Sequence, residues 1–174
     1  MIRVRVVVGN PKPQSRTAHI ATRLAEILLA EGTFELTVID LADHAHQIFD
    51  WPSPEMSMLN DDVAGSDLLI AASPTYKATY TGLFKAFFDR YPNLGLRGVV
   101  AIPLMTGDDT RHALAPEVSL RPLLVELGAI VPTQGLYFVM TQMANLDEVL
   151  TEWAQEARER LSAHLRTSLA TLAE

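Results

Sequence analysis

Short apolar runs alternate along this chain with longer segments whose apolar residues recur at helical spacing. The short runs cover residues 4–8, 34–41, 67–72, 99–104 and 136–139, and each has the length of a β-strand. Strands that alternate with helices are typical of a parallel sheet whose two faces are both covered by helices. The pattern therefore predicts an α/β fold.

Three of the longer segments have the period of an amphipathic helix. The first carries apolar residues between Ile20 and Leu28, and Gly32 supplies a stop signal. The second has a broad apolar face made by Leu83, Phe84, Phe87 and Phe88. The third runs through residues 146–165 and follows Asn145, which can cap it.

Two segments are less regular. Residues 42–66 are acidic and contain Pro52 and Pro54, so we expect a long connection with one short helix. Residues 111–127 have a helical period that Pro116 and Pro122 interrupt, which predicts either two short helices or one kinked helix.

Composition indicates one folded domain over residues 1–174, because 48% of the residues are hydrophobic and no stretch resembles a linker. The chain has 14 basic and 21 acidic residues, a formal net charge of −7, which repels nucleic acids and anionic membranes. We therefore expect neither partner.

Cysteine is absent from the chain, which excludes disulfides, thiolate nucleophiles and iron–sulfur clusters. Redox chemistry would need a bound cofactor. The first residues read directly as a strand and are too short for a signal-peptide core, so we expect a cytoplasmic protein without a membrane span. The adjacent Asp108 and Asp109 lack further oxygen ligands at a matching spacing, and no metal site is expected.

The loop after the first strand has the features of an anion site. It runs from Gly9 to Thr17 into the start of a helix, where backbone N–H groups, the Ser15 and Thr17 hydroxyls and the Arg16 guanidinium can converge on one phosphate. The alternative is that Ser15 only caps the helix and Arg16 is solvated. The loop is neither a Walker A sequence nor a G-x-G-x-x-G fingerprint, so a monophosphate such as that of FMN fits it better than a dinucleotide.

Two further loops follow strands at the same edge of the expected sheet. In residues 73–85, Pro74 fixes the backbone and Tyr76 offers a flat face that suits an isoalloxazine ring, although an aromatic here can equally belong to an interface or the core rim. In residues 105–110, Gly107 permits close approach of the backbone to a ring.

Taken in order, these loops resemble the NAD(P)H-dependent FMN reductase family, in particular the flavin reductases that feed two-component monooxygenases of sulfonate assimilation. The resemblance rests on the residues 9–17, on 73–77 leading into Tyr80, Thr81, Gly82 and Lys85, and on 102–107 followed by His112 and by 120–124. It covers most of the chain.

The resemblance implies a flavodoxin-like three-layer sandwich with a five-stranded parallel sheet in the order 2-1-3-4-5. It also implies reduction of FMN by NADPH or NADH through hydride transfer to flavin N5, and release of the product to a partner monooxygenase. In such chemistry the protein positions the reactants, so no catalytic side chain is expected. The aromatic turn around Tyr80 and the helix with Phe84, Phe87 and Phe88 would suit the interface of a homodimer or homotetramer, and the alternative is that these residues belong to the core.

The residues implied to bind the cofactor are Asn10, Ser15, Arg16, Thr17, Pro74, Thr75, Tyr76, Lys77, Thr106, Gly107 and Asp108. Where the family commonly has further glycines, this chain has Asp108 and Asp109, whose charge predicts weaker retention of anionic reduced FMN.

Two other functions fit the same fold. One is a flavodoxin-like electron carrier that keeps its FMN, although Lys12 and Arg16 in the first loop suit an additional anionic partner better. The other is a flavin-dependent quinone or azo reductase. His112 stands at a helix start, where histidine is more often a surface group than a proton donor.

Overall fold

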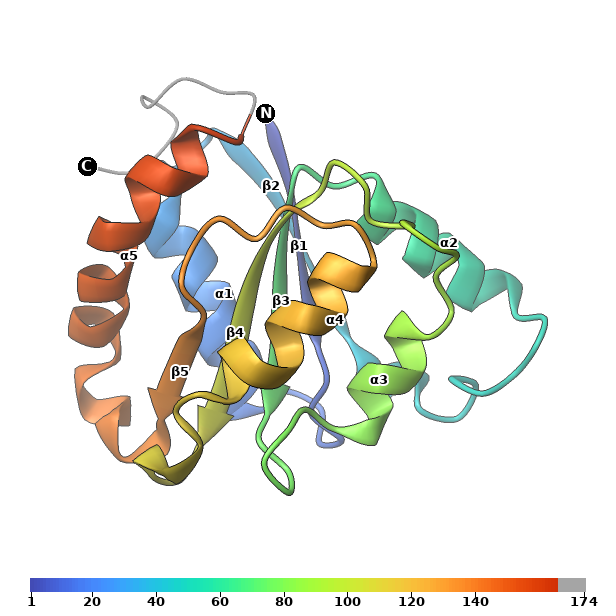
Figure 1. The fold of residues 1–174 in the computed structure, drawn as a ribbon, viewed down its shortest axis with the longest axis horizontal. Helices are drawn as coiled ribbons and strands as arrows, with labels where there is room; N and C mark the ends of the chain where they lie inside the picture. The colour runs from blue at the N-terminus through green and yellow to red at the C-terminus, as the bar shows by residue number, and fades with distance from the viewer. Residues whose placement is uncertain (166–174) are drawn as a thin grey trace.

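The computed structural model describes residues 1–165 and contains a parallel five-stranded sheet between two layers of helices (Figure 1). The strands lie in the order β2-β1-β3-β4-β5, which confirms the predicted order. Their bounds are β1 Ile2–Val8, β2 Phe34–Asp40, β3 Leu68–Pro74, β4 Val100–Gly107 and β5 Leu136–Val139.

The two central strands run further than their apolar residues indicate. Pro74 pairs with Thr106 at the end of β3 and β4, and the Thr75 amide still donates to the Thr106 carbonyl at 2.7 Å. Backbone pairing needs no apolar side chain, so the ladder continues into polar residues beyond the predicted ends. The loops that follow these strands therefore start from rigid backbone.

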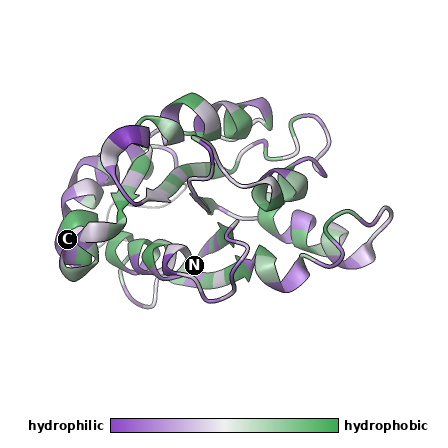
Figure 2. Cartoon of the chain, turned by 90° about the horizontal axis from the view of Figure 1, so that it is seen from below, coloured by the Kyte–Doolittle hydropathy of each residue, from purple (hydrophilic) through white to green (hydrophobic). Residues whose placement is uncertain are grey.

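Each face of the sheet has its own layer of helices. Helices α1 (Arg16–Leu28) and α5 (Leu146–Ser162) cover one face, whereas α2 (Pro54–Ala64), α3 (Gly82–Phe88) and α4 (Arg121–Glu126) cover the other (Figure 1). Figure 2 looks onto the lower edge of Figure 1 and shows both layers flanking the strands.

The two layers bury different side chains. Aliphatic residues such as Leu24 and Leu150 fill the core under α1 and α5. The opposite core holds an aromatic cluster in which the ring of Phe88 lies 4.6 Å from that of Phe84 and 5.3 Å from that of Phe87, measured between centroids. The three rings are buried and so belong to the core rather than to an interface between chains. Phe84 also packs against Gly9, so the cluster anchors α3 beside the start of the loop that follows β1.

The two irregular segments, residues 42–66 and 111–127, are more helical than expected and contain an unusual helix, respectively. The connection after β2 begins with a 3-10 turn (Leu41–His44) and includes α2, a full helix capped by Ser53. Residues 111–127 were expected to form two short helices or one kinked helix. The structure instead has a 3-10 turn (Thr110–His112), followed by a π-helix (Pro116–Leu120) that runs directly into α4.

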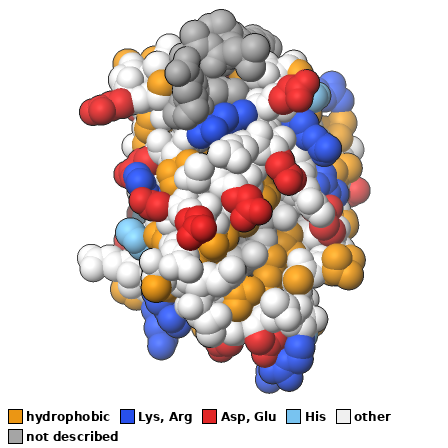
Figure 3. Space-filling view, turned by 90° about the vertical axis from the view of Figure 1, so that its left-hand side faces the viewer, with side chains coloured by type: hydrophobic (Ala, Val, Ile, Leu, Met, Phe, Trp, Pro, Cys, Tyr) orange, Lys and Arg blue, Asp and Glu red, His pale blue; other side chains and the backbone are white. Residues whose placement is uncertain are grey.

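The start of the last helix differs from its prediction. Asn145 occupies the N-cap position of α5 but its side chain makes no capping bond, because a 3-10 helix (Met140–Asn145) leads into α5 without a break. Acidic and basic side chains are both spread over the outer side that carries α5, and both also occur at the lower edge (Figure 3). Among the described residues, no helix has the length and apolarity needed to cross a membrane.

Candidate active site

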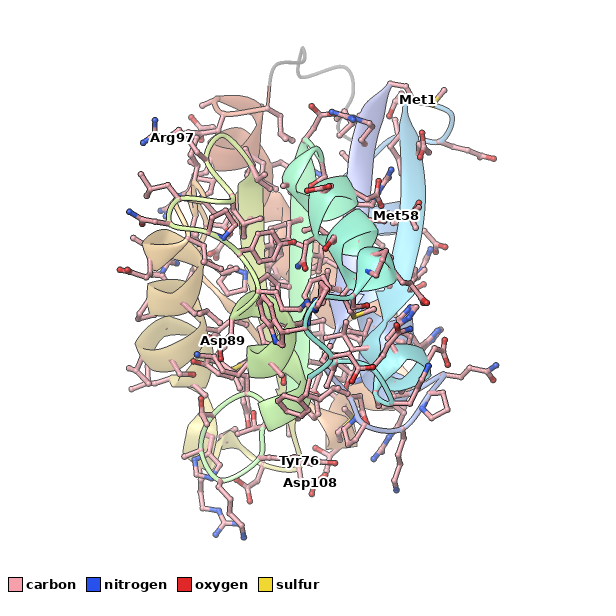
Figure 4. The ribbon with its side chains drawn as sticks, turned by 90° about the vertical axis from the view of Figure 1, so that its right-hand side faces the viewer. Met1, Met58, Tyr76, Asp89, Arg97 and Asp108 are labelled. Atoms are coloured by element: carbon pink, nitrogen blue, oxygen red, sulfur yellow. The ribbon has the colours of Figure 1, made fainter. Side chains whose placement is uncertain are left out.

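The carboxyl ends of β1, β3 and β4 meet at the lower edge of the molecule in Figure 1, and a cleft of about 430 Å³ opens between the loops that follow them. Tyr76 and Asp108, from two of these loops, both lie at this edge and line the cleft (Figure 4). The cleft is lined by Asn10, Lys12, Pro13, Gln14, Ser15, Arg16, Pro74, Thr75, Tyr76, Thr106, Gly107, Asp108 and Met140.

The loop after β1 is held by its own side chains and by β2. Asn10 Oδ1 accepts a hydrogen bond from the Lys12 amide at 3.0 Å, and Asp40 Oδ2 accepts one from the Gln14 amide at 2.9 Å. Ser15 caps α1, since its Oγ accepts the Ala18 amide at 3.2 Å. The capping role that was one alternative for Ser15 is therefore present, and the capped helix points its N-terminus at the cleft.

This N-terminus offers groups that bind anions. The first amides of a helix lack intrahelical acceptors, and within residues 1–165 those of Arg16 and Thr17 bond to no other group. The Arg16 guanidinium is exposed and forms none of the ion pairs found within the described residues. The Arg16 amide, the positive end of the helix dipole and the Arg16 guanidinium thus face the cleft together.

The loop after β3 is a tight hairpin that presents an aromatic ring. Tyr76 and Thr79 exchange backbone hydrogen bonds at 2.8 and 3.3 Å, and Lys77 and Ala78 between them adopt φ values of 52° and 71°. Such a two-residue turn requires positive φ at both central positions. The side chain of Tyr76 is 47% exposed, so its ring stands at the rim of the cleft rather than in the core.

Buried hydroxyls fix this hairpin to the first loop. Ser73 Oγ accepts the Thr81 amide at 3.1 Å, and Thr81 Oγ1 donates to the Gly9 carbonyl at 2.5 Å. Gly9 also packs so closely on α3 that a Cβ there would lie 2.4 Å from the Cβ of Phe84. The loop after β1 and the hairpin after β3 are therefore held together rigidly along one side of the cleft.

The loop after β4 brings only one of its two acids to the cleft. Asp109 turns to Arg111, which donates to it from Nε at 2.9 Å and from Nη2 at 2.6 Å, and these hydrogen bonds lower the pKa of Asp109 to about 2. Asp108 is exposed and lines the cleft. The negative charge expected beside a flavin is thus reduced to that of Asp108.

The structure brings together all but two of the predicted site residues. Thr17 is fully buried beneath the cleft, where its hydroxyl contacts Thr106 and Asn10. Lys77 stands at the exposed tip of the hairpin, outside the lining. His112 is exposed on its 3-10 turn and does not line the cleft either.

Sequence reasoning missed several residues of the cleft. Pro13 and Gln14 line it although neither was expected to, and Lys12, which the sequence suggested only as a charge for an additional anionic partner, lines it as well. Met140 enters from the end of β5. Met140 could have been predicted, because all strands of a parallel sheet end at the same edge and Met140 directly follows the fifth strand.

Comparison with known proteins extends the match from single loops to the whole chain. The sequence profile of the family described as NADPH-dependent FMN reductase matches residues 2–144. An FMN reductase (NADPH) of Pseudomonas putida is 31% identical over 170 residues, which span 95% of this chain and 85% of that protein. The NADH-dependent FMN reductase SfnF of Pseudomonas putida is 34% identical over 143 residues, or 79% of this chain and 77% of SfnF.

Comparison of the fold with solved structures points to the same family. The crystal structure of the NADH:FMN oxidoreductase EMOB in its apo form superposes with a TM-score of 0.85 at 28% identity, covering 99% of this chain and 95% of EMOB. An oxidoreductase of Corynebacterium diphtheriae superposes with a TM-score of 0.80 at 25% identity, covering 95% and 97% of the two chains. With its loops, its sheet order and its sequence all in agreement, the chain belongs to the NADPH-dependent FMN reductase family.

Proposed function

We propose that this chain binds FMN in the cleft at the carboxyl edge of the sheet and reduces it with NADH or NADPH by hydride transfer to flavin N5. The observation that carries this proposal is the capped N-terminus of α1, where Arg16, whose amide and guanidinium have no partner among the described residues, lines a cleft that also contains Tyr76 and Gly107. Relatives at comparable identity are named for NADPH in one case and for NADH in the other, so both nucleotides are candidates.

The residues present fit FMN. A cleft of about 430 Å³ has the size of a small-molecule site. Ser15 and the guanidinium and backbone amide of Arg16 match the charge and the acceptor oxygens of a terminal phosphate. Pro74, Thr75 and Tyr76 from one loop and Thr106 and Gly107 from another offer flat surface and close backbone for a ring.

Bound FMN and a nicotinamide nucleotide supply the redox chemistry, in which a hydride passes between them. The chain's own contribution is orientation and electrostatics. Hydride transfer requires the two rings to be held at the right distance and orientation, and no side chain has to donate or accept a proton for it. We therefore assign no catalytic side chain.

We also infer that reduced FMN leaves the cleft for a partner monooxygenase rather than staying bound. The cleft is open to solvent at Tyr76, and Asp108 places a negative charge where an anionic reduced flavin would lie. Both features favour release and speak against a flavodoxin-like electron carrier.

A homo-oligomer fits the outer side of the π-helix and α4. Leu114, Val118 and Val125 are 70%, 67% and 54% exposed there, and an exposed apolar face of this kind suits a contact between protein chains. Light scattering coupled to gel filtration tests this: a dimer or tetramer that Val118→Glu dissociates supports it, and a monomeric wild type contradicts it.

Single-turnover kinetics without oxygen tests the reaction. NADH and NADPH carrying deuterium at the transferred C4 position are mixed with protein and FMN, and flavin bleaching is followed. We expect slower bleaching with the deuterated nucleotide and reduced flavin that separates from the protein on gel filtration. Tight FMN binding without bleaching by either nucleotide would instead identify an electron carrier.

A further inference from the structure

Two buried hydroxyls join loops that lie far apart in the sequence. Thr17 in the first turn of α1 and Thr106 near the end of β4 are 0% and 1% exposed, and their Oγ1 atoms lie 3.1 Å apart. Asn10 donates from Nδ2 to Thr17 Oγ1 at 3.3 Å. The hydroxyl of Thr17 is therefore engaged inside the protein rather than exposed to the cleft.

This hydroxyl pair is part of a continuous chain of hydrogen bonds through all three loops. On one side, Asn10 Oδ1 accepts the Lys12 amide at 3.0 Å and so shapes the loop after β1. On the other side, the carbonyl of Thr106 accepts the Thr75 amide at 2.7 Å and so fixes the start of the aromatic hairpin. The phosphate end of the cleft is connected in this way to both segments at its ring end.

Apolar side chains would fill these two positions without loss of shape, because valine has the same branching as threonine. A buried hydroxyl stabilises the fold only modestly once the cost of leaving water is included. Neighbouring buried positions of β4, such as Leu104 and Met105, are indeed apolar. The polar pair is thus better explained by a need to hold two loops in one relative position.

We propose that the Thr17–Thr106 pair is a positioning device that couples the phosphate end of the cleft to its ring end, so that an anion bound at the N-terminus of α1 orders the segments that hold the flavin ring. The proposal rests on FMN binding in this cleft. Thr17 acts here through Thr106 and Asn10, not as a direct ligand of the phosphate.

Flavin binding with and without the phosphate tests this coupling. Dissociation constants of FMN and riboflavin are measured by flavin fluorescence for wild type, Thr17→Val, Thr106→Val and the double variant. We expect the ratio of riboflavin to FMN dissociation constants to fall about fivefold in each single variant, a change within the range for coupled neighbours. The double variant should lose no more than either single one, and Thr17→Ser should restore the ratio.

A matched control is Thr133→Val. Thr133 is also buried, its Oγ1 has no hydrogen-bond partner in the described chain, and it does not line the cleft, so its replacement should leave the ratio unchanged. Should a valine variant fail to fold, Thr17→Ala removes the same hydroxyl with less apolar volume.

An equal loss of affinity for FMN and riboflavin would overturn the coupling, because it would show that the pair merely supports the fold. Unchanged binding of both flavins in every variant would overturn it as well. A wild type that binds neither flavin would contradict the proposed function itself, which separates the failure of that function from the failure of the coupling.

Discussion

The phenol of Tyr137 occupies the space that a side chain at position 107 would need. A Cβ on Gly107 would lie 1.9 Å from Tyr137 Oη, and this Oη donates a hydrogen bond to the Asp109 carbonyl at 3.0 Å. A residue of β5 therefore shapes the loop that follows β4. Burial also raises the pKa of Tyr137, which keeps its hydroxyl protonated as a donor.

Replacement of Gly107 tests this contact. Gly107→Ala should displace Tyr137 and break its bond to Asp109, so we expect a loss of about 1–3 kcal/mol in the free energy of unfolding and weaker FMN binding. Thermal unfolding and flavin titration measure the two effects. Gly82→Ala is the matched control, because no atom lies within 4 Å of a Cβ there. A Gly107→Ala variant as stable as wild type with unchanged FMN affinity would show that Tyr137 does not restrain the loop.

Arg16 is predicted to bind the phosphate. Loss of a charge-assisted hydrogen bond in Arg16→Ala should raise the FMN dissociation constant and KM about tenfold or more and leave riboflavin binding almost unchanged. Arg97→Ala is the control, since Arg97 is an exposed arginine at the opposite end of the molecule (Figure 4). Equal effects of Arg16→Ala on FMN and riboflavin would place the phosphate elsewhere.

Asp108 is expected to weaken the binding of reduced FMN. Asp108→Asn removes the one carboxylate among the described residues that line the cleft. In a water-exposed cleft, a Coulomb interaction of up to about 1 kcal/mol corresponds to an affinity gain of about two- to fivefold for reduced FMN, with a smaller change for oxidised FMN. Anaerobic titration measures both. The same gain in Asp61→Asn, which changes an exposed carboxylate outside the cleft, would mean that only net charge matters.

The junction of the π-helix and α4 should respond to acid. Arg121 donates from Nε to Glu117 at 2.5 Å and from Nη1 to the Val131 carbonyl at 2.8 Å, and Glu117 accepts the Gly135 amide. The hydrogen bond from Arg121 holds the pKa of Glu117 below its ordinary value of 4.5. A carboxyl with a lowered folded pKa stabilises the fold above its unfolded pKa and loses that contribution as the pH falls through the folded one.

Glu117→Gln should therefore cost about 1–3 kcal/mol in the free energy of unfolding near neutral pH. This cost should shrink as the pH falls from the ordinary pKa of the carboxyl through its lower pKa in the folded protein. Denaturant unfolding at several pH values measures the difference from wild type. Glu148→Gln changes an exposed glutamate and should give a flat difference. A cost for Glu117→Gln that does not vary with pH would contradict the role of its charge.

The sequence predicted the sheet well because each strand is an apolar run between turn signals, and the run at 136–139 coincides with β5. It also located Ser15 and Arg16, since helix starts after strands have a recognisable composition. These features depend on residues that are neighbours in the chain.

What the sequence did not predict depends on contacts between distant residues. The π-helix is accompanied by the Glu117 bonds to Arg121 and Gly135, and nothing in the local period distinguishes it from a kinked α-helix. The burial of Thr17 follows from its contact with Thr106, which is 89 residues away. The role of Tyr137 was not predicted either, because it depends on contacts with Gly107 and Asp109, which lie far from Tyr137 in the sequence.

FMN-dependent oxidation of NADH and NADPH tests the central claim most directly. Purified protein is mixed with each nucleotide, free FMN is titrated in, and loss of the nicotinamide absorbance is followed for wild type, Arg16→Ala and Arg97→Ala. The account predicts saturable, FMN-dependent turnover with at least one nucleotide, a higher FMN KM in Arg16→Ala and wild-type behaviour in Arg97→Ala. The absence of FMN-dependent turnover with both nucleotides would contradict it.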